Sequence, residues 1–181
     1  MAKKNEKKEK NAPVQLFNKF GEFNSVEELN EAAAGQKAEG DLEALKALAK
    51  ENGIDDGSVE DYINEYTNEL AMPIIAAAGR IAVEKETFKD LETRVKAPCI
   101  AIAAMADSMI VNLEFAKSVM KKGKRIKRIA ELMYKERCIM GTDQELEDII
   151  RAYYQNGEGG AKGAIAVIRG ITERYNGQGA V

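Results

Sequence analysis

Six of the eight residues from 121 to 128 are cationic, and this short stretch is the strongest chemical signal in the sequence. Its side chains suit phosphate groups or an acidic protein surface as ligands. Arg125, Lys127 and Arg128 stand where a new helix should start, although the helix dipole disfavours cations there. A solvated basic face without a ligand is the alternative reading. The candidate binding residues are Lys117, Lys121, Lys122, Lys124, Arg125, Lys127 and Arg128.

Acidic side chains gather in a different part of the chain. Residues 21–69 hold fourteen acids and only three lysines, a balance of −11, whereas the whole chain has a net charge of −3. Such a surface is able to occupy a basic channel built for nucleic acid. Ordinary helix capping and solvation is the alternative, because acids stabilise the first turn of a helix. The candidate acidic partner surface comprises Glu27, Glu28, Glu31, Asp55, Asp56, Glu60 and Asp61.

Residue types that enzymes use most are scarce. The chain has no histidine, which is the commonest general base and metal ligand, and its two cysteines form no CxxC pair. The segment GEGGAKG lacks the GK[ST] ending of a phosphate-binding loop. We therefore expect no enzyme activity, no cofactor and no metal site. No secretory signal is evident, so we expect a cytoplasmic protein.

Apolar residues recur at helical spacing along most of the chain, and three capping patterns mark helix starts. Ser25 with Glu28 should begin a helix over 26–39, and Asp41 should cap the next, which Gly53 ends in a left-handed conformation. We expect Ser58, paired with Asp61, to cap a third helix that carries Leu70 on its apolar face.

The middle of the chain predicts two longer helices. Pro73 should begin the first, which continues to about residue 95, and Pro98 should lie in the first turn of the second, which reaches about residue 120. The second is apolar nearly all round, and this favours a central position, with a subunit interface as the alternative. Residues 97–113 are too short and Ala-rich to span a membrane.

Three further helices complete the predicted fold. They cover about 125–139, a segment that Thr142 and Glu145 cap, and about 161–175, with a flexible break at 156–160. The fold class is all-α, a compact bundle of seven or eight helices with a disordered basic N-terminal tail. The predicted parts are the tail at 1–15, an acidic helical subdomain at 16–70 and a helical core domain at 71–181.

Two stretches resemble known proteins. Residues 116–155, from AKSVMKKGKRIKRIAELMYKERC to TDQELEDIIRAYYQ, resemble the PcfK-like module of mobile elements in Gram-positive bacteria. That module also occurs in anti-CRISPR proteins that inhibit the RNA-guided nuclease of type II systems. Residues 16–63, from LFNKFGEFNS to GSVEDYI, resemble the opening of a gut-bacterial member of that inhibitor group.

The resemblance implies a protein that binds the type II effector nuclease with its guide RNA and blocks target DNA binding or cleavage. Either the acidic half fills the DNA channel of the nuclease, or the cluster at 121–128 grips phosphates of guide RNA or DNA. A DNA-binding accessory protein of a conjugative or phage element is the alternative function. A helical assembly protein that forms a homodimer through residues 98–113 is a third.

Overall fold

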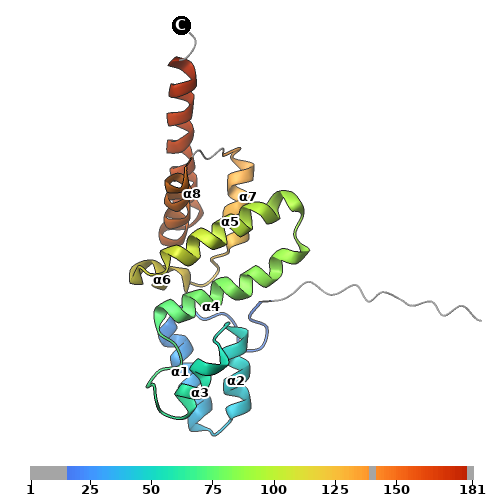
Figure 1. Ribbon diagram of the computed structural model, residues 1–181, viewed down its shortest axis with the longest axis vertical. Coiled ribbons are helices and arrows are strands. Elements are labelled where there is room, and N and C mark those ends of the chain that lie inside the picture. The colour runs from blue at the N-terminus through green and yellow to red at the C-terminus, as the bar shows by residue number, and fades with distance from the viewer. Residues whose placement is uncertain (1–15, 139–141, 179–181) are drawn as a thin grey trace, which may run out of the picture.

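The computed structural model describes residues 16–138 and 142–178, and within these ranges the chain forms eight α-helices, one short 3-10 helix and no strand (Figure 1). The prediction of an all-α bundle is confirmed. The predicted tail at 1–15 lies outside the described residues. The elements are α1 (Val26–Ala38), α2 (Leu42–Glu51), α3 (Asp56–Ile63), α4 (Pro73–Glu86), η1 (Thr87–Asp90), α5 (Thr93–Met109), α6 (Leu113–Val119), α7 (Ile126–Lys135) and α8 (Asp143–Gln178).

Helix α4 lies between two groups of helices, with α1–α3 on one side and α5–α8 on the other (Figure 1). Buried apolar side chains form two clusters, one for each group. Ala76 packs in the first cluster, and Ala77, the next residue, packs in the second. Both groups of helices therefore use α4 as a wall of their core.

The end of α2 touches α4 backbone to backbone. A Cβ atom added to Gly53 would lie 2.3 Å from the carbonyl oxygen of Gly79 in α4. Gly53 has a φ of 71°, and the amide of Ile54 donates to Ala49 across 2.9 Å, as in a Schellman motif. The predicted left-handed glycine at the end of the second helix is confirmed, and here it also permits close helix packing.

Local capping signals are mostly confirmed. The hydroxyl of Ser25 accepts from the amide of Glu28, and Thr142 and Glu145 exchange both hydrogen bonds of a capping box. The prediction for α3 is wrong, because Asp55 and not Ser58 caps that helix. The carboxylate of Asp55 accepts from the Ser58 amide at 3.0 Å, so the helix begins one turn earlier than predicted.

The third helix is also shorter than predicted, since it ends at Ile63 and leaves Leu70 in the following loop. Leu70 is nevertheless buried with the α1–α3 cluster. Asn30 of α1 holds this loop in place, because its side-chain amide donates to the Ala71 carbonyl and accepts from the Ala71 amide. The end of the loop before α4 is therefore anchored to α1.

The two long helices predicted in the middle of the chain are wrong in their bounds. The first ends at Glu86 and gives way to η1, and the second starts at Thr93, so that Pro98 lies inside it. Pro98 is the sixth residue of α5, where its missing N–H removes only one hydrogen bond near the start of the helix. The second helix stops at Met109, because Asn112 caps a separate helix, α6, with its side chain.

Helix α5 is not buried all round. Cys99, Ile102 and Ala106 face the core, whereas Ile100 on the opposite side remains 55 % exposed. The predicted apolar helix thus has one core face and one solvent face.

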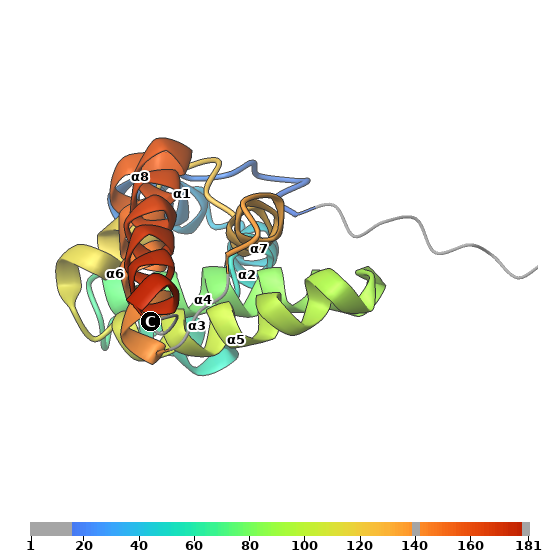
Figure 2. The same cartoon turned by 90° about the horizontal axis from the view of Figure 1, so that it is seen from above.

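Helix α8 is kinked at Gly157, whose φ is 72°. This glycine lies within the predicted break at 156–160, and the chain returns to helix immediately after it. Viewed nearly end-on, α8 has α6 on one side and α7 on the other (Figure 2). The part of α8 beyond the kink extends away from the α1–α3 end of the molecule (Figure 1).

Candidate interaction surfaces

The predicted cationic stretch, residues 121–128, forms the connection between α6 and the start of α7. Arg125 is the N-cap residue of α7 and has extended backbone angles, φ −143° and ψ 134°. The helix begins at Ile126, within one residue of the predicted start. The predicted end near 139 is wrong, because the helix ends at Lys135 and Glu136 forms its C-cap.

Arg125 forms a two-pronged ion pair with Glu22. The two distances between guanidinium nitrogens and carboxylate oxygens are 2.6 and 2.8 Å. Glu22 also accepts from the Gly123 amide at 2.9 Å and lies 3.3 Å from Arg80 of α4. Burial acts to raise the pKa of Glu22, but the hydrogen bonds from Arg125 and Gly123 outweigh it and hold the pKa below its ordinary value. Glu22 is therefore ionised and fully engaged at neutral pH.

Arg80 and Glu84, one turn apart on α4, each cap a neighbouring helix. A guanidinium nitrogen of Arg80 donates to the carbonyls of Met120 and Lys121, at 2.6 and 3.3 Å, where α6 ends. The carboxylate of Glu84 accepts from the Ile126 amide at 2.7 Å, where α7 begins. Both side chains are only 2 % exposed. When Glu84 is ionised, the two groups carry opposite charges at opposite helix ends, each with the sign that the helix dipole favours.

Glu84 compensates for the cations at the start of α7, where the helix dipole disfavours positive charge. Its carboxylate provides the negative group that the N-terminus lacks locally, since Arg125 makes no side-chain cap. Burial raises the pKa of Glu84 to about 7, against the lowering effects of the Ile126 amide and of the nearby Arg125 and Arg80. The group therefore titrates near neutral pH.

Sequence reasoning missed Glu22, Arg80 and Glu84. A signal for the last two was present, because both fall on the same helical stripe as the buried Ala77 and Ile81. A charged side chain on a buried stripe needs a partner, and an i, i+4 pair of opposite sign on such a stripe marks a buried network. No local signal identifies Glu22, since its partner lies far away in the sequence.

Most of the other predicted basic residues also have partners within the protein. Lys124 donates to the Tyr153 carbonyl at 2.9 Å. Arg128 pairs with Glu158 and Glu131, Lys127 with Glu131, and Lys117 with Glu114. In the part of the chain that the structure describes, the ammonium groups of Lys121 and Lys122 are exposed and have no ion pair. The cluster is thus largely compensated, and two of its cations stay open to a ligand.

The predicted acidic residues fall into two settings. Glu27, Glu28 and Glu31 are exposed on α1, and Glu27 lines a hollow of about 300 Å³ together with Lys117 and Lys121. At this point charges of opposite sign adjoin. Hydrogen bonding from Ser25 lowers the pKa of Glu27, and Lys117 adds to the effect.

The setting of α3 is different, because no lysine or arginine occurs between residues 51 and 79. All four predicted acids of this segment are exposed, and two more exposed carboxylates follow in the loop after α3. Lys37 of α1 approaches from one side, with its ammonium 3.9 Å from Glu65. We call this group the α3 acidic surface; it comprises Asp55, Asp56, Glu60, Asp61, Glu65 and Glu69.

A cleft of about 820 Å³ lies beside Arg125 and Glu84, where the segment at 16–18 faces η1 and α7. Most of its charged lining is internally paired, since Lys127 and Arg128 both contact Glu131 and Arg125 contacts Glu22. Apolar groups from Leu16 and Leu91 form part of the wall. A ligand in this cleft would therefore find space but few charged groups that are free to bind it.

The described ranges contain no cluster of metal-ligating side chains. There, no three His, Cys, Asp or Glu side chains lie close enough together to hold a metal ion. Cys99 and Cys138 are free thiols, and burial raises the pKa of Cys99 to about 11.

Among the described residues no helix has the length and apolar character needed to cross a bilayer. Comparisons of the chain with protein-family models, with curated proteins and with solved structures find no match.

Proposed function

We propose that the protein inhibits a type II RNA-guided nuclease by binding it, and that the α3 acidic surface enters the positively charged channel for target DNA. The observation that carries this proposal is the run of residues 51–79, which holds seven carboxylates and no cation. The exposed carboxylates of the α3 acidic surface, of which only Glu65 has an ion pair among the described residues, resemble the phosphates of a nucleic acid in charge. A channel built for DNA attracts such a surface from a distance and retains it by contact.

The contrast with the basic cluster favours the acidic surface as the contact. The side chains of five of the seven predicted basic residues make a hydrogen bond or ion pair inside the protein. If these five side chains bound a ligand, they would have to break their internal contacts first. Lys121 and Lys122 alone provide too few charges for tight phosphate binding, since each neutralised phosphate adds only a modest salt-dependent increment.

The fold supports the same assignment. α2 and α3 pack on α4 through the Gly53–Gly79 contact and the buried side chains of the first cluster, so the acidic surface is preorganised. A preorganised surface loses little conformational entropy on binding. We infer the class of partner from the resemblance of residues 16–63 and 116–155 to the anti-CRISPR group.

A cleavage assay tests the proposal. A panel of purified type II nucleases, each loaded with guide RNA, is mixed with the protein before target DNA is added. We expect cleavage by at least one nuclease to stop near an equimolar ratio, and DNA binding by its catalytically inactive form to stop in parallel. Full cleavage by every nuclease at a large excess of the protein contradicts the proposal.

Charge reversal locates the contact. The triple variant Asp56→Lys, Glu60→Lys, Asp61→Lys removes three exposed carboxylates from the α3 acidic surface and leaves the cap residue Asp55 intact. A matched control reverses three exposed carboxylates elsewhere, at Glu86, Asp90 and Glu114, with the same change in net charge. We expect only the first variant to lose inhibition. Equal loss in both variants would assign the effect to net charge and contradict a defined contact.

A further inference from the structure

The loop that joins α3 to α4 forms a hollow beside the α3 acidic surface. Its volume is about 540 Å³, and its walls combine carboxylates with apolar groups. The contributing side chains include Asp61 and Glu69, the ring of Tyr66, and the apolar Met72 and Ile75. A site with negative groups above an apolar floor suits a cation that carries its own apolar stem.

Two side chains at this hollow are unusually exposed for their type. Tyr66 is 79 % exposed and Met72 is 61 % exposed, although both are large and apolar in most of their surface. The backbone at Glu65, the residue before Tyr66, adopts a left-handed conformation with φ 64°. Such a conformation is costly for a residue other than glycine, and here it directs the chain so that the following ring stands in solvent.

The floor of the hollow is held firmly. Asn30 of α1 makes two hydrogen bonds to the backbone of Ala71, at 3.0 and 3.1 Å, and Leu70 is buried in the first apolar cluster. The backbone of the loop is tied to α3 as well, since the Tyr66 amide donates to the Asp61 carbonyl at 2.9 Å. The backbone that carries the exposed Tyr66 ring and Met72 thioether is therefore held in place by hydrogen bonds.

The protein already contains one example of the recognition that this hollow offers. The ammonium group of Lys37 lies 4.7 Å from the centre of the Tyr62 ring, donates to the Tyr62 carbonyl at 2.7 Å and approaches the Glu65 carboxylate. Lys37 thus occupies the ring face of Tyr62, near the end of α3. Tyr66, four residues further on, has a free ring face and carboxylates beside it but no cation in the described structure.

We propose that the hollow lined by Asp61, Tyr66, Glu69 and Met72 receives an arginine side chain of a partner protein. The guanidinium plane stacks on the Tyr66 ring, the carboxylates accept its N–H groups, and Met72 covers the aliphatic stem. Arginine is favoured over lysine because its planar group stacks and forms forked hydrogen bonds at once. This inference rests on the proposed function, since the walls of a DNA channel supply such arginines.

A binding experiment that needs no nuclease tests the inference. The full-length protein, labelled with ¹⁵N, is titrated with nona-arginine and, separately, with nonalysine. We expect nona-arginine to shift the amide resonances of residues 61–75 first and to bind several-fold more tightly than nonalysine. Equal affinity for the two peptides, or shifts spread evenly over α1, α2 and α3, would show diffuse charge attraction and overturn the proposal.

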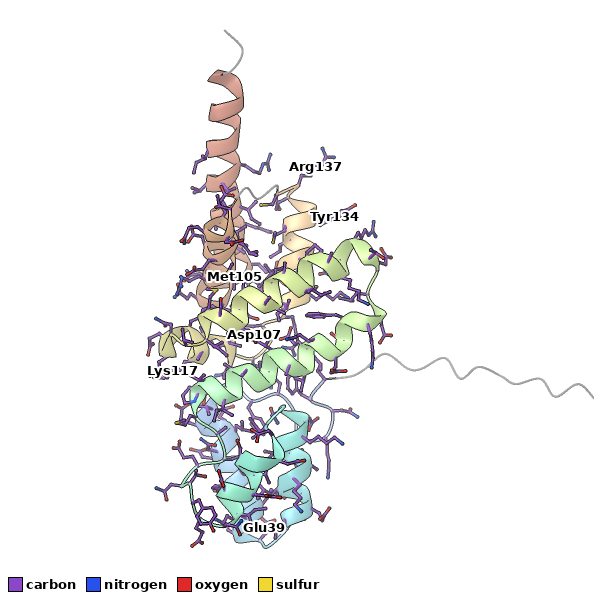
Figure 3. The ribbon with its side chains drawn as sticks, in the orientation of Figure 1. Glu39, Met105, Asp107, Lys117, Tyr134 and Arg137 are labelled. Carbon is purple, nitrogen blue, oxygen red and sulfur yellow. The ribbon has the colours of Figure 1, made fainter. Side chains whose placement is uncertain are left out.

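Two variants sharpen the test, and both replace exposed side chains that the fold does not need. We expect Tyr66→Ala and Met72→Ala each to weaken nona-arginine binding, the first by roughly three- to thirty-fold, the range that cation–π stacking provides. Tyr134→Ala is the matched control, because Tyr134 is similarly exposed and lies at the opposite end of the molecule from Glu39 of the α1–α3 end (Figure 3). Unchanged binding by Tyr66→Ala, or an equal loss with Tyr134→Ala, would refute the site.

The outcomes separate this inference from the proposed function. If nona-arginine binds at the hollow and no nuclease is inhibited, the hollow stands as an arginine site and the proposed partner is wrong. If a nuclease is inhibited equally by the wild type and by Tyr66→Ala, the proposed function stands and the hollow is not its contact.

Discussion

Glu22 and Arg125 form a two-pronged ion pair across 103 residues of sequence, and this pair joins the chain before α1 to the start of α7. The carboxylate of Glu22 also meets Arg80, which reaches in from α4 and donates to the Phe23 carbonyl at 2.7 Å. One acidic side chain thus ties together three parts of the chain: the segment before α1, helix α4 and the start of α7.

Replacement of Glu22 by alanine should strongly destabilise the protein. The change leaves Arg125 and the buried Arg80 without their carboxylate, and breaking a buried ion pair of this kind costs about 3 kcal/mol. Urea unfolding followed by circular dichroism measures the free energy of unfolding. Lys127→Ala is the control, since it removes an exposed 3.7 Å pair with Glu131 and should change stability by less than about 1 kcal/mol. Similar losses in the two variants would contradict a special role for Glu22.

The stability of the protein should fall as the pH rises from about 5 to 8, and Glu84 is the reason. Its pKa in the folded protein is about 7, above the ordinary 4.5, so the folded state holds the proton more tightly than the unfolded state. The resulting stabilisation is complete below about pH 4.5 and is lost as the pH rises through 7. The difference amounts to about 3 kcal/mol.

Glu84→Gln isolates this contribution. Glutamine keeps an oxygen that accepts from the Ile126 amide but has no proton to lose. We expect the free energy of unfolding of the variant, relative to wild type, to rise by about 3 kcal/mol between pH 5 and 8. Arg80, Arg125 and Glu22 face the same carboxyl, and the lowered pKa of Glu22 places its own titration below this window. Parallel pH profiles for the two proteins would contradict the assignment.

The close approach of α2 and α4 predicts opposite effects for two Gly→Ala changes. A Cβ at Gly79 would lie 2.4 Å from the Asn52 carbonyl oxygen and 2.9 Å from that of Gly53, both backbone atoms that cannot turn aside. Gly79→Ala should therefore destabilise by about 2 kcal/mol or more. Gly35→Ala in α1 meets open space and should stabilise by about 0.5–1 kcal/mol, the gain in helix propensity. Thermal unfolding compares the two, and an unharmed Gly79→Ala would disprove the tight packing.

Local structure was the part of this fold that could be predicted from the sequence. An N-cap hydrogen bond spans only three residues, so Ser25 and Thr142 marked their helices correctly, although Glu28 accepts from the Asn24 amide and not from that of Ser25. Where two capping residues compete within one turn, local rules fail to decide. Asp55 and Ser58 both suit the N-cap, and the ionised carboxylate, the stronger acceptor, takes the position.

The state of the basic cluster was harder to predict, because long-range contacts decide which of its cations are paired inside the protein. The cationic stretch at 121–128 was evident from composition alone, but apart from Glu131 its acidic partners are Glu22, Glu84 and Glu158, which lie thirty or more residues away. A net charge summed over a short stretch of sequence does not include partners that are distant in the sequence. The α3 acidic surface was identified more fully, since between residues 51 and 79 no cation exists to pair with it locally.

The division of the basic cluster into paired and open cations leads to a prediction about nucleic acid. If the protein alone binds DNA, the binding should depend on Lys121 and Lys122, whose ammonium groups have no ion pair in the described structure. Each lysine that meets a phosphate adds about 0.9 to the slope of log affinity against log salt concentration. The double change to serine at these positions should therefore reduce that slope by about 2.

The matched control is a double change to serine at Lys127 and Arg128, which already contact Glu131 inside the protein. This control should leave the slope nearly unchanged, because paired cations release no additional counterions when DNA binds. Fluorescence anisotropy with a labelled 20-base-pair duplex, measured between 50 and 200 mM salt, gives both slopes. A larger effect at Lys127 and Arg128 than at Lys121 and Lys122 would mean that their internal pairs open in favour of phosphate. That result would favour the alternative function of DNA binding, with Lys127 and Arg128 as its contacts.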